Sequence, residues 1–575
     1  ISFGFHAKSG IILNLCIISV YRTNGYENFC FVRLFITAKG GSMKRSEEKK
    51  YEKLSPFELK NKLINIAETH HERMMLNAGR GNPNWVAVTP RHGFFRFGLF
   101  ALEESLRGQE LPAIGGPCDK KDILKRFETF LKKNEKEPGV PFLRNALDYV
   151  RDELKLDPEG FLQEMVDGIL GDNYPVPERM LALTEKIVHR YLVQEMCGNE
   201  PPKGNFDLFA TEGGTAAMDY IFTTLMENRL LQKRDKIALG TPIFTPYLEI
   251  PRLNDYRFVE LEIQQDENGG WQYPDSEIEK LADPAVKAFF VVHPSNPTSV
   301  AMDGKTLNKI GRLVRTKRKD LIIITDDVYG TFVNDFRSLV TVAPKNTILV
   351  YSFSKYFGAT GWRLGVIGIH RENVFDRKIA AFPDKTRKQL NQRYGTVTLN
   401  PAKMKLIDRM VADSRSVALH HTAGLSTPQQ VLMVFFSLYC LTDRRGDYKK
   451  VAQYIVTHRH NTLYNAMEIT PPDDAHGTRY YTTIDVPALA ESRYGKEFAR
   501  HLRKAYEPID FIVRLAEKKS VVLLDGGGFD APNMSIRVSL ANLPNRMYEE
   551  IGRGVNELLE EYHRLWEQGR KKSKK

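Results

Sequence analysis

Eight residues in the central part of the chain have types that can act on a carbonyl compound. They are Gly214, Thr215, Asn296, Asp326, Tyr329, Ser352, Lys355 and Arg363. A lysine can form a Schiff base with an aldehyde, and an aspartate can keep a heterocyclic nitrogen protonated. Amides at a helix start, hydroxyls and an arginine can together bind a phosphate. Singly, each residue also has an ordinary structural interpretation, such as a helix cap, a turn or a solvated lysine.

Most of these residues stand just after short apolar segments. The predicted strands are 207–210, 236–240, 288–293, 321–325, 347–352 and 365–369. Their alternation with helix-length segments predicts an α/β fold with a mostly parallel sheet buried between helices. Ligands bind beyond the carboxyl ends of the strands in such sheets, so the eight residues are expected to converge. Together they form the set that a pyridoxal-phosphate enzyme requires.

The regions before and after these predicted strands differ from them in the spacing of their apolar residues. Apolar residues recur at helical spacing through 120–170, and beyond about 440 the pattern becomes mixed, with strands predicted at 521–524 and 535–539. A closing helix is predicted to bury one face, made of Met547, Ile551, Val555, Leu558, Tyr562 and Leu565. The expectation is a large α/β domain, a smaller α+β domain and a helical insertion.

The expected division into domains follows these changes in the spacing of apolar residues along the chain. An arm and part of the small domain occupy 43–118, the helical insertion and an interface segment occupy 119–204, and the large cofactor-binding domain occupies 205–435. The rest of the small domain occupies 436–569, and 570–575 form a basic tail. Residues 1–42 contrast with the charged segment after Met43, where Ser55, Pro56 and Glu58 predict a capped helix start. We expect 1–42 to be translated upstream sequence, with a targeting segment as the alternative.

Composition excludes several classes of protein. The 575 residues carry 83 Lys and Arg against 71 Asp and Glu, a formal charge of +12 that is concentrated at the two ends. The body is too mildly basic to predict a nucleic-acid surface, and no apolar run approaches the length of a membrane span.

The pairs His70-His71 and His420-His421 lack metal-site spacing, so no metal is expected. Packing is the expected role of Cys118, Cys197 and Cys440.

Longer motifs resemble a known enzyme family. The segment SFSKYFGATGWRLG (352–365) resembles the Schiff-base signature of the fold-type I aminotransferases. Five further segments resemble the aspartate 4-decarboxylases within that superfamily: NAGRGNPN (77–84), EMVDGILGDNYPVPERM (164–180), EGGTAAM (212–218), TDDVYGTF (325–332) and HTAGLSTPQQ (421–430). The resemblance extends from Met43 to about Tyr562. It implies a cytoplasmic enzyme that uses pyridoxal 5'-phosphate to convert L-aspartate to L-alanine and CO₂, with aspartate:2-oxoglutarate aminotransferase side activity.

The resemblance also implies a role for each cofactor-binding residue. Lys355 forms the covalent link and then moves protons, while Asp326 pairs with the pyridine nitrogen. Asn296 and Tyr329 hydrogen-bond the 3-oxygen of the ring. The phosphate ligands that it implies are Gly214, Thr215, Ser352 and Arg363. Phe244 is expected to stack on the ring, although the family often has Trp or Tyr there.

The substrate and the partner are implied in the same way. Arg537, in SIRVSL (535–540), is expected to grip the α-carboxylate, with Gly81 and Asn296 lining the same pocket. Arg80 is the candidate for a looser contact with the β-carboxylate, and a structural salt bridge is its alternative role. Tyr174 is expected to reach the phosphate from a neighbouring subunit, which implies a dimer with shared active sites or a larger ring of dimers, such as a dodecamer.

Two alternative functions stay open. A plain aspartate or aromatic-type aminotransferase uses the same active-site residues without decarboxylation. A transcription regulator with a pyridoxal-phosphate domain needs a basic helix-turn-helix module, and 43–200 shows no such concentration of basic charge. No nucleic-acid or membrane partner is therefore expected; the expected partners are L-aspartate, 2-oxo acids and further copies of the chain.

Overall fold

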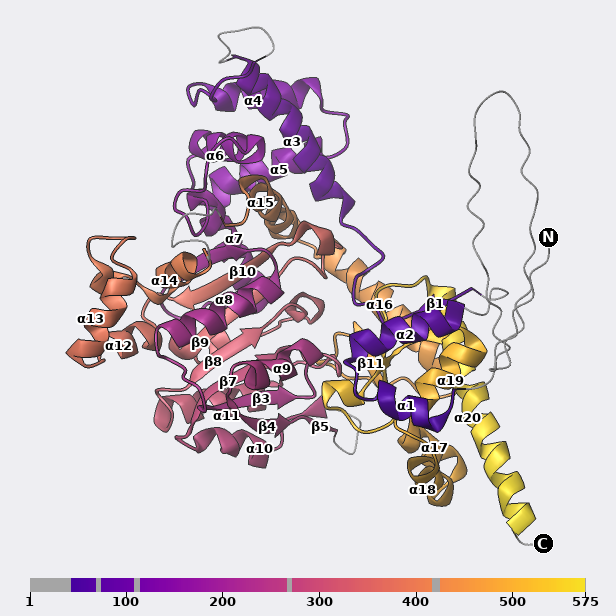
Figure 1. The fold of residues 1–575 in the computed structure, drawn as a ribbon. Helices are drawn as coiled ribbons and strands as arrows, with labels where there is room; N and C mark the ends of the chain where they lie inside the picture. The colour runs from indigo at the N-terminus through magenta and orange to yellow at the C-terminus, as the bar shows by residue number, and fades with distance from the viewer. Residues whose placement is uncertain (1–42, 69–73, 108–113, 266–270, 416–423, 574–575) are drawn as a thin grey trace, which may run out of the picture.

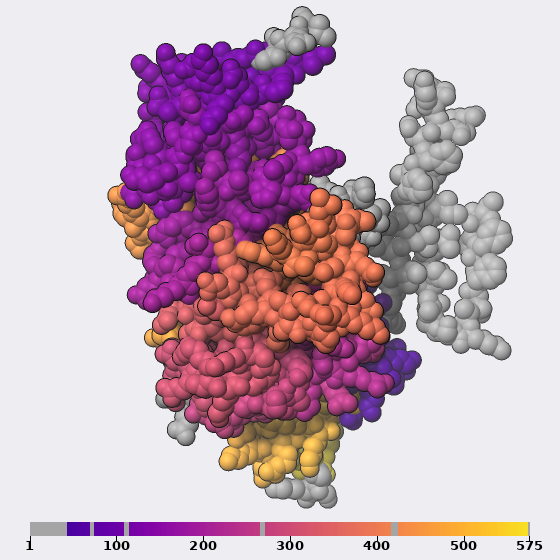
Figure 2. All heavy atoms as spheres, turned by 90° about the vertical axis from the view of Figure 1, so that its left-hand side faces the viewer, coloured from indigo at the N-terminus to yellow at the C-terminus, as the bar shows by residue number. Residues whose placement is uncertain are grey.

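The computed structural model describes residues 43–68, 74–107, 114–265, 271–415 and 424–573. Residues 1–42 and both histidine pairs lie outside the described residues, as does part of the 421–430 motif. The described chain forms a sheet domain, a helical part above it and a small domain at its side (Figure 1). In Figure 2 the helical part, in purple, lies above the sheet domain.

A seven-stranded sheet forms the centre of the large domain, in the order β2-β10-β9-β8-β7-β3-β4. Its strands are β2 (Phe206–Thr211), β3 (Lys236–Thr241), β4 (Arg257–Glu262), β7 (Val286–Val292), β8 (Ile322–Asp326), β9 (Thr347–Ser352) and β10 (Gly365–His370). Only β10 in this sheet runs antiparallel to its neighbours, so the mostly parallel sheet is confirmed. The sequence patterns missed β4, because this edge strand exposes most of its side chains and has no buried apolar run.

Helices cover both faces of the sheet. They include α8 (Gly214–Glu227), α9 (Thr245–Leu253), α10 (Asp275–Glu279), α11 (Gly304–Thr316) and α14 (Leu406–Asp413), whereas α12 (Val374–Ala380) and α13 (Asp384–Arg393) project at the side of the sheet (Figure 1). Apart from the edge strand β4, the strands of this sheet are almost completely buried, as expected for a parallel sheet. A small hairpin of β5 (Gln264–Gln265) and β6 (Trp271–Gln272) lies beside β4.

The helical part is built around α15 (Thr427–Thr442), which is apolar on nearly every side and buries twelve of its residues. The helices around it are α3 (Val88–Arg107), α4 (Ile123–Lys133), α5 (Val140–Asp148), α6 (Pro158–Leu170) and α7 (Ala182–Met196). Helix α3 falls in the 43–118 range that the sequence groups with the small domain, yet it packs against α5, α6 and α15. Its chain position alone does not reveal this, because the contacts with α15 span more than 300 residues.

The small domain combines both ends of the described chain. Its helices are α1 (Arg45–Tyr51), α2 (Pro56–Glu68), α16 (Asp447–Ala466), α17 (Val486–Tyr494), α18 (Lys496–Ala505), α19 (Asp510–Lys519) and α20 (Asn545–Ser573). Its strands are β1 (Leu76–Asn77), β11 (Tyr481–Asp485), β12 (Val521–Val522), β13 (Leu524–Asp525) and β14 (Ser535–Ser539). Helix α2 starts as predicted, with the Glu58 amide donating to Ser55 Oγ at 3.3 Å.

Two sequence expectations for this domain need correction. The strand predicted at 521–524 is divided, because β12 pairs with β1 whereas β13 pairs with β14. The predicted apolar face of α20 is buried from Ile551 to Tyr562, but Leu565 is 49% exposed. Figure 1 shows the reason: the last turns of α20 extend beyond the domain into solvent.

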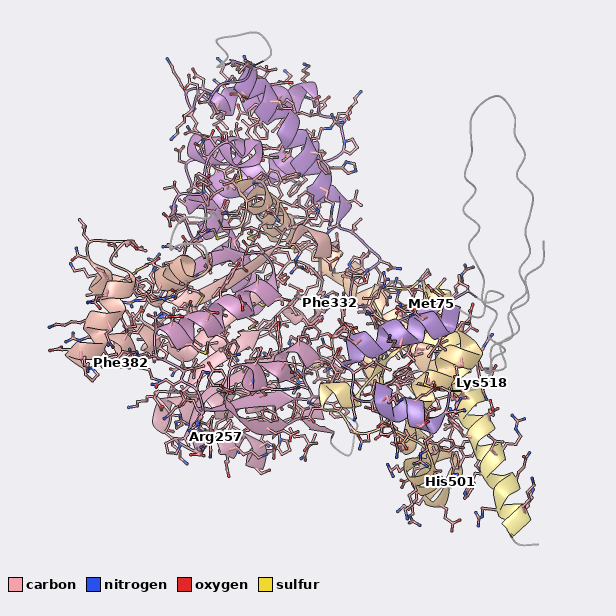
Figure 3. All side chains as sticks on the ribbon, in the orientation of Figure 1. Met75, Arg257, Phe332, Phe382, His501 and Lys518 are labelled. Atoms are coloured by element: carbon pink, nitrogen blue, oxygen red, sulfur yellow. The ribbon has the colours of Figure 1, made fainter. Side chains whose placement is uncertain are left out.

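The sheet domain and the small domain meet at an aromatic junction. Phe332, labelled in Figure 3, lies between the two domains, with its ring centroid 5.1 Å from that of Tyr480 and 6.3 Å from that of Trp85. Trp85 belongs to the segment that connects the small domain to α3. Within the described ranges, no helix is long and apolar enough to cross a membrane, and no group of His, Cys, Asp and Glu is arranged to hold a metal.

Candidate active site

A cavity of about 320 Å³ lies between the carboxyl ends of the central strands and the small domain. The segment around Gly81 and Asn82, called the N-terminal segment below, closes one side of it. Its lining residues include Phe57, Gly81, Asn82, Gly214, Thr215, Phe244, Tyr247, Asn296, Asp326, Tyr329, Ser352, Ser354, Lys355, Thr360, Arg363, Tyr481 and Arg537. The charged members of the lining are three cations and one carboxylate, so the cavity favours an anionic ligand.

The sheet explains why the predicted residues meet here. Strands β2, β7, β8 and β9 end at the same edge, and Asp326 and Ser352 are the last residues of β8 and β9. Gly214 begins α8 directly after β2, and Asn296 follows β7. All eight residues singled out first in the sequence line this one cavity.

Asp326 is buried at the floor of the cavity. Its Oδ2 accepts a hydrogen bond from the Tyr247 hydroxyl at 2.8 Å, and its Oδ1 accepts one from the Val328 amide at 3.3 Å. Burial raises the pKa of Asp326 to about 6, while the bond from Tyr247 acts in the opposite direction. The sequence patterns missed Tyr247; its place one helical turn after Phe244 at the start of α9 was the available signal.

Lys355 follows β9 and points toward the N-terminal segment. Its Nζ donates to the Gly81 carbonyl at 3.0 Å, and the Tyr480 hydroxyl donates to the same oxygen at 2.9 Å. A Cβ on Gly81 would clash with the Tyr481 hydroxyl and lie 3.4 Å from Lys355 Nζ. A side chain at position 81 would therefore fill the space next to the reactive amine.

The other end of the cavity has the donors for a phosphate. Gly214 and Thr215 form the first turn of α8, where backbone amides and the helix dipole attract anions. Arg363 donates to the Glu212 and Thr360 carbonyls at 3.1 and 3.0 Å, which holds its guanidinium over Gly213. A Cβ at position 213, whose φ is +92°, would clash with that guanidinium.

Arg537 projects from β14 on the small-domain side and is 1% exposed. Its guanidinium donates to Asn296 Oδ1 at 3.3 Å and to the Gly79 carbonyl at 2.9 Å, and it lies 4.3 Å from the centroid of the Tyr481 ring. Its Nε has no hydrogen-bond partner, and no carboxylate among the described residues forms an ion pair with it. Burial lowers the pKa of Arg537, and no described carboxylate lies beside it to offset the cost of the buried charge.

Aromatic side chains from distant segments complete the walls. The Tyr481 and Tyr329 hydroxyls are 3.0 Å apart, and both rings are buried. Phe244, before α9, meets Phe57 of α2 edge-on at 5.7 Å between ring centroids. Tyr481 and Phe57 escaped the sequence patterns, and neither has a local signal, since both stand in ordinary amphipathic segments.

Two predicted residues lie outside this cavity. Tyr174 is 80% exposed between α6 and α7, and Arg80 is exposed beside Gly81 without lining the cavity. Lys60 lies near Arg80 and Arg537. Burial lowers the pKa of Lys60, and the positive charges of these two arginines lower it further. The segment next to the cavity is thus strongly cationic.

The three cysteines of the described residues are buried and free. Burial raises the pKa of both Cys118 and Cys197 to about 12 and also raises the pKa of Cys440. Their thiols are therefore poor nucleophiles, in keeping with the expected packing role.

Comparisons with known proteins agree with this geometry. Residues 196–554 match the family model described as aminotransferase class I and II. A bifunctional aspartate aminotransferase and L-aspartate beta-decarboxylase from a Pseudomonas species is 50% identical over 512 residues, which cover 89% of this chain and 96% of that relative.

Solved structures share the fold. The aspartate aminotransferase from Thermus thermophilus with maleate is 16% identical, covers 91% of this chain and 100% of its own, and has a TM-score of 0.51. An aromatic aminotransferase from Pyrococcus horikoshii is also 16% identical, covers 86% of this chain and 99% of its own, and has a TM-score of 0.54. The expected fold-type I architecture is thus confirmed, and the chain belongs to the class I and II aminotransferase family.

Proposed function

We propose that the chain is a pyridoxal-phosphate enzyme that converts L-aspartate to L-alanine and CO₂, with transamination of aspartate as a second activity. The observation that carries this proposal is Arg537, a buried guanidinium with no carboxylate partner among the described residues, facing the cavity that contains Lys355 and Asp326. A substrate carboxylate supplies the missing charge. The bifunctional name of the Pseudomonas relative supports aspartate as the substrate and β-decarboxylation as the reaction.

The donor set fits pyridoxal phosphate. The α8 N-terminus, Ser352 and Arg363 suit the phosphate, Asp326 suits the pyridine nitrogen, and Lys355 suits the aldehyde. When bound, this cofactor supplies the electron sink that lets the Cα proton and then the β-carboxylate leave. The protein has to orient the substrate, exclude water and move protons.

Each side chain has a defined task in this proposal. Lys355 Nζ takes the proton from the substrate Cα, and the Gly81 carbonyl holds the amine in place. Asp326 would hold the pyridine nitrogen, and that positive partner, added to the two donors that Asp326 already has, would favour its charged form. Tyr329 and Asn296 would hold the ring oxygen, and Phe244 would pack on the ring.

The substrate carboxylates have separate contacts. Arg537 binds the α-carboxylate through two parallel hydrogen bonds, the geometry that a guanidinium favours. Arg80, next to Lys60, is the proposed contact of the β-carboxylate. A loose contact there suits decarboxylation, because a tight ion pair would stabilise the ionised ground state and so oppose the loss of CO₂.

We also propose a dimer with shared active sites, because the exposed Tyr174 is free to contact a second copy.

The experiment that tests the function measures alanine and CO₂ against oxaloacetate after the purified protein is incubated with L-aspartate, pyridoxal phosphate and a 2-oxo acid. Alanine and CO₂ as main products support the proposal. Oxaloacetate alone would identify a plain aminotransferase, and no product from aspartate would refute both.

A further inference from the structure

Tyr481 lines the cavity but has no task in the reaction as proposed so far. It begins β11 and is almost completely buried. Its hydroxyl lies 3.0 Å from the Tyr329 hydroxyl, and the centroid of its ring lies 4.3 Å from the guanidinium carbon of Arg537. One side chain therefore contacts both the residue proposed for the ring oxygen of the cofactor and the residue proposed for the substrate α-carboxylate.

Contacts with three other segments fix the position of the Tyr481 side chain. Its backbone amide donates to Ser299 Oγ at 2.8 Å, which ties the start of β11 to the loop that follows β7. In the antiparallel pair of β11 and β14, Tyr481 and Arg537 are diagonal neighbours on the same face of the sheet, which brings the ring onto the guanidinium. A Cβ on Gly81 would clash with the Tyr481 hydroxyl, so the glycine leaves room for that oxygen.

The two hydroxyls of Tyr329 and Tyr481 have one arrangement that suits the cofactor. A phenol has a single hydrogen to donate, and its oxygen can accept a further bond. If Tyr329 gives its hydrogen to the ring oxygen, its own oxygen remains as an acceptor, and Tyr481 has to be the donor. Hydrogen bonds that are linked in a buried site polarise one another, so a bond accepted from Tyr481 makes Tyr329 a stronger donor. Both tyrosines are buried, so water does not compete for this bond.

We propose that Tyr481 is a positioning residue that acts through Tyr329 on the ring oxygen of the cofactor. The inference rests on the proposed function, because it requires pyridoxal phosphate in the cavity. The hydroxyl of Tyr481 carries this role, whereas its ring packs on Arg537. The ionisable groups around the two hydroxyls are Tyr480, Lys355 and Arg537, and removal of one oxygen atom leaves all three in the site.

The test uses the visible absorbance of the covalent link between Lys355 and the cofactor, which changes when the link loses its proton. Donors to the ring oxygen favour the deprotonated link, because that form leaves more negative charge on the oxygen. Tyr481→Phe is therefore expected to raise the pKa of the link by about half a pH unit, since Tyr329 becomes a weaker donor. Absorbance spectra of the holoenzyme across a series of pH values measure this pKa without any turnover.

Further variants separate this role from a general effect on the structure. Tyr329→Phe should raise the pKa of the link more than Tyr481→Phe does, and adding Tyr481→Phe to it should cause no further rise, because the two residues act in one chain of hydrogen bonds. Tyr464→Phe is the matched control. It removes another buried hydroxyl beside β11, bonded to Thr482 at 2.7 Å, but Tyr464 does not line this cavity, so the pKa should stay unchanged.

The KM for aspartate provides the second measurement. Tyr481→Phe should change it by less than about twofold, because phenylalanine keeps a ring on Arg537. An unchanged pKa in Tyr481→Phe would overturn the proposal, and so would an equal rise with and without the Tyr329 hydroxyl. A large rise in KM with an unchanged pKa would assign Tyr481 to the substrate pocket instead. A wild-type holoenzyme without any pH-dependent absorbance would refute the proposed function itself, and this role of Tyr481 with it.

Discussion

The two walls of the cavity differ in how their charges are balanced. On the large-domain wall, Asp326 accepts two hydrogen bonds and lies near the positive charge of Lys355. On the small-domain wall, Arg537 is just as buried, yet it has backbone, amide and ring contacts in place of a carboxylate. The first wall suits a group that stays bound through many turnovers, and the second suits an anion that enters and leaves.

This difference has an energetic meaning. A buried charge without a counter-ion costs several kcal/mol unless other groups solvate it. The Asn296 and Gly79 oxygens and the Tyr481 and Phe529 rings solvate Arg537 in part. If Arg537 binds the substrate carboxylate as proposed, binding would recover the remaining cost. Arg537 would then increase substrate affinity at the expense of the stability of the substrate-free protein.

The largest effect is expected at the large-domain wall. Lys355→Ala should lower kcat for both alanine and oxaloacetate formation by about 10⁴-fold or more, because it would remove both the proposed covalent link and the proposed proton-transfer group. Both products are measured from the same reaction, and circular dichroism checks the fold. Lys345→Ala removes an exposed lysine paired with Glu372 and should leave both rates unchanged. An active Lys355→Ala variant with an unchanged cofactor absorbance would exclude Lys355 as the reactive amine.

The second-largest effect on the reaction is expected from a substitution in the small-domain wall. Arg537→Met should reduce kcat/KM for aspartate by roughly 30- to 5,000-fold, equivalent to about 2–5 kcal/mol, because the substrate carboxylate would lose its proposed charged partner. The same change should leave the melting temperature of the substrate-free protein equal or higher, since it removes an unpaired buried charge. Arg459→Met is the control: Arg459 also has no ion pair with a carboxylate among the described residues, but all three of its guanidinium nitrogens donate, to Asn84, Leu540 and Asn545, so its loss should lower stability. If both variants were destabilised equally, the contrast between the walls would be wrong.

The buried Asp326 should make the free energy of unfolding of the cofactor-free chain depend on pH. Burial raises its pKa from 3.8 to about 6, so the folded chain binds this proton more tightly than the unfolded chain. The stabilisation from this group is fully present below about pH 4 and is lost as the pH rises to about 6, an effect of about 3 kcal/mol. Asp326→Asn should remove that part of the pH dependence in urea unfolding. Tyr247→Phe should extend it to higher pH, because the lost hydrogen bond held the pKa down; a shift toward lower pH would contradict that role of Tyr247.

The smallest effect is expected beside the small-domain wall. If Arg80 contacts the β-carboxylate, Arg80→Ala should change the ratio of alanine to oxaloacetate, by tenfold for about 1.4 kcal/mol of differential barrier. Arg80→Lys should retain part of the wild-type ratio, because it keeps the charge. Product ratios are measured at saturating aspartate. An unchanged ratio with both rates falling together would leave Arg80 with a general binding or structural role.

The convergence of the candidate residues at the strand ends could be predicted from the sequence alone. Asp326, Ser352 and Lys355 stand at or just after buried apolar runs, and such runs form parallel strands because both of their faces are covered. The chain direction then places the ends of the parallel strands at the same edge of the sheet. The capped start of α2 was equally predictable, since a cap involves residues only three positions apart.

The side chains that face those strand ends depend instead on long-range packing. Tyr481 meets Tyr329 across 152 residues, and Phe57 reaches Phe244 from the N-terminal part of the chain. Neither residue stands out from its own segment, because periodicity reports which face of an element is buried and not which element covers it. The same reason explains α3, whose two apolar faces weaken its amphipathic pattern and whose place in the helical part depends on contacts with α15, more than 300 residues away.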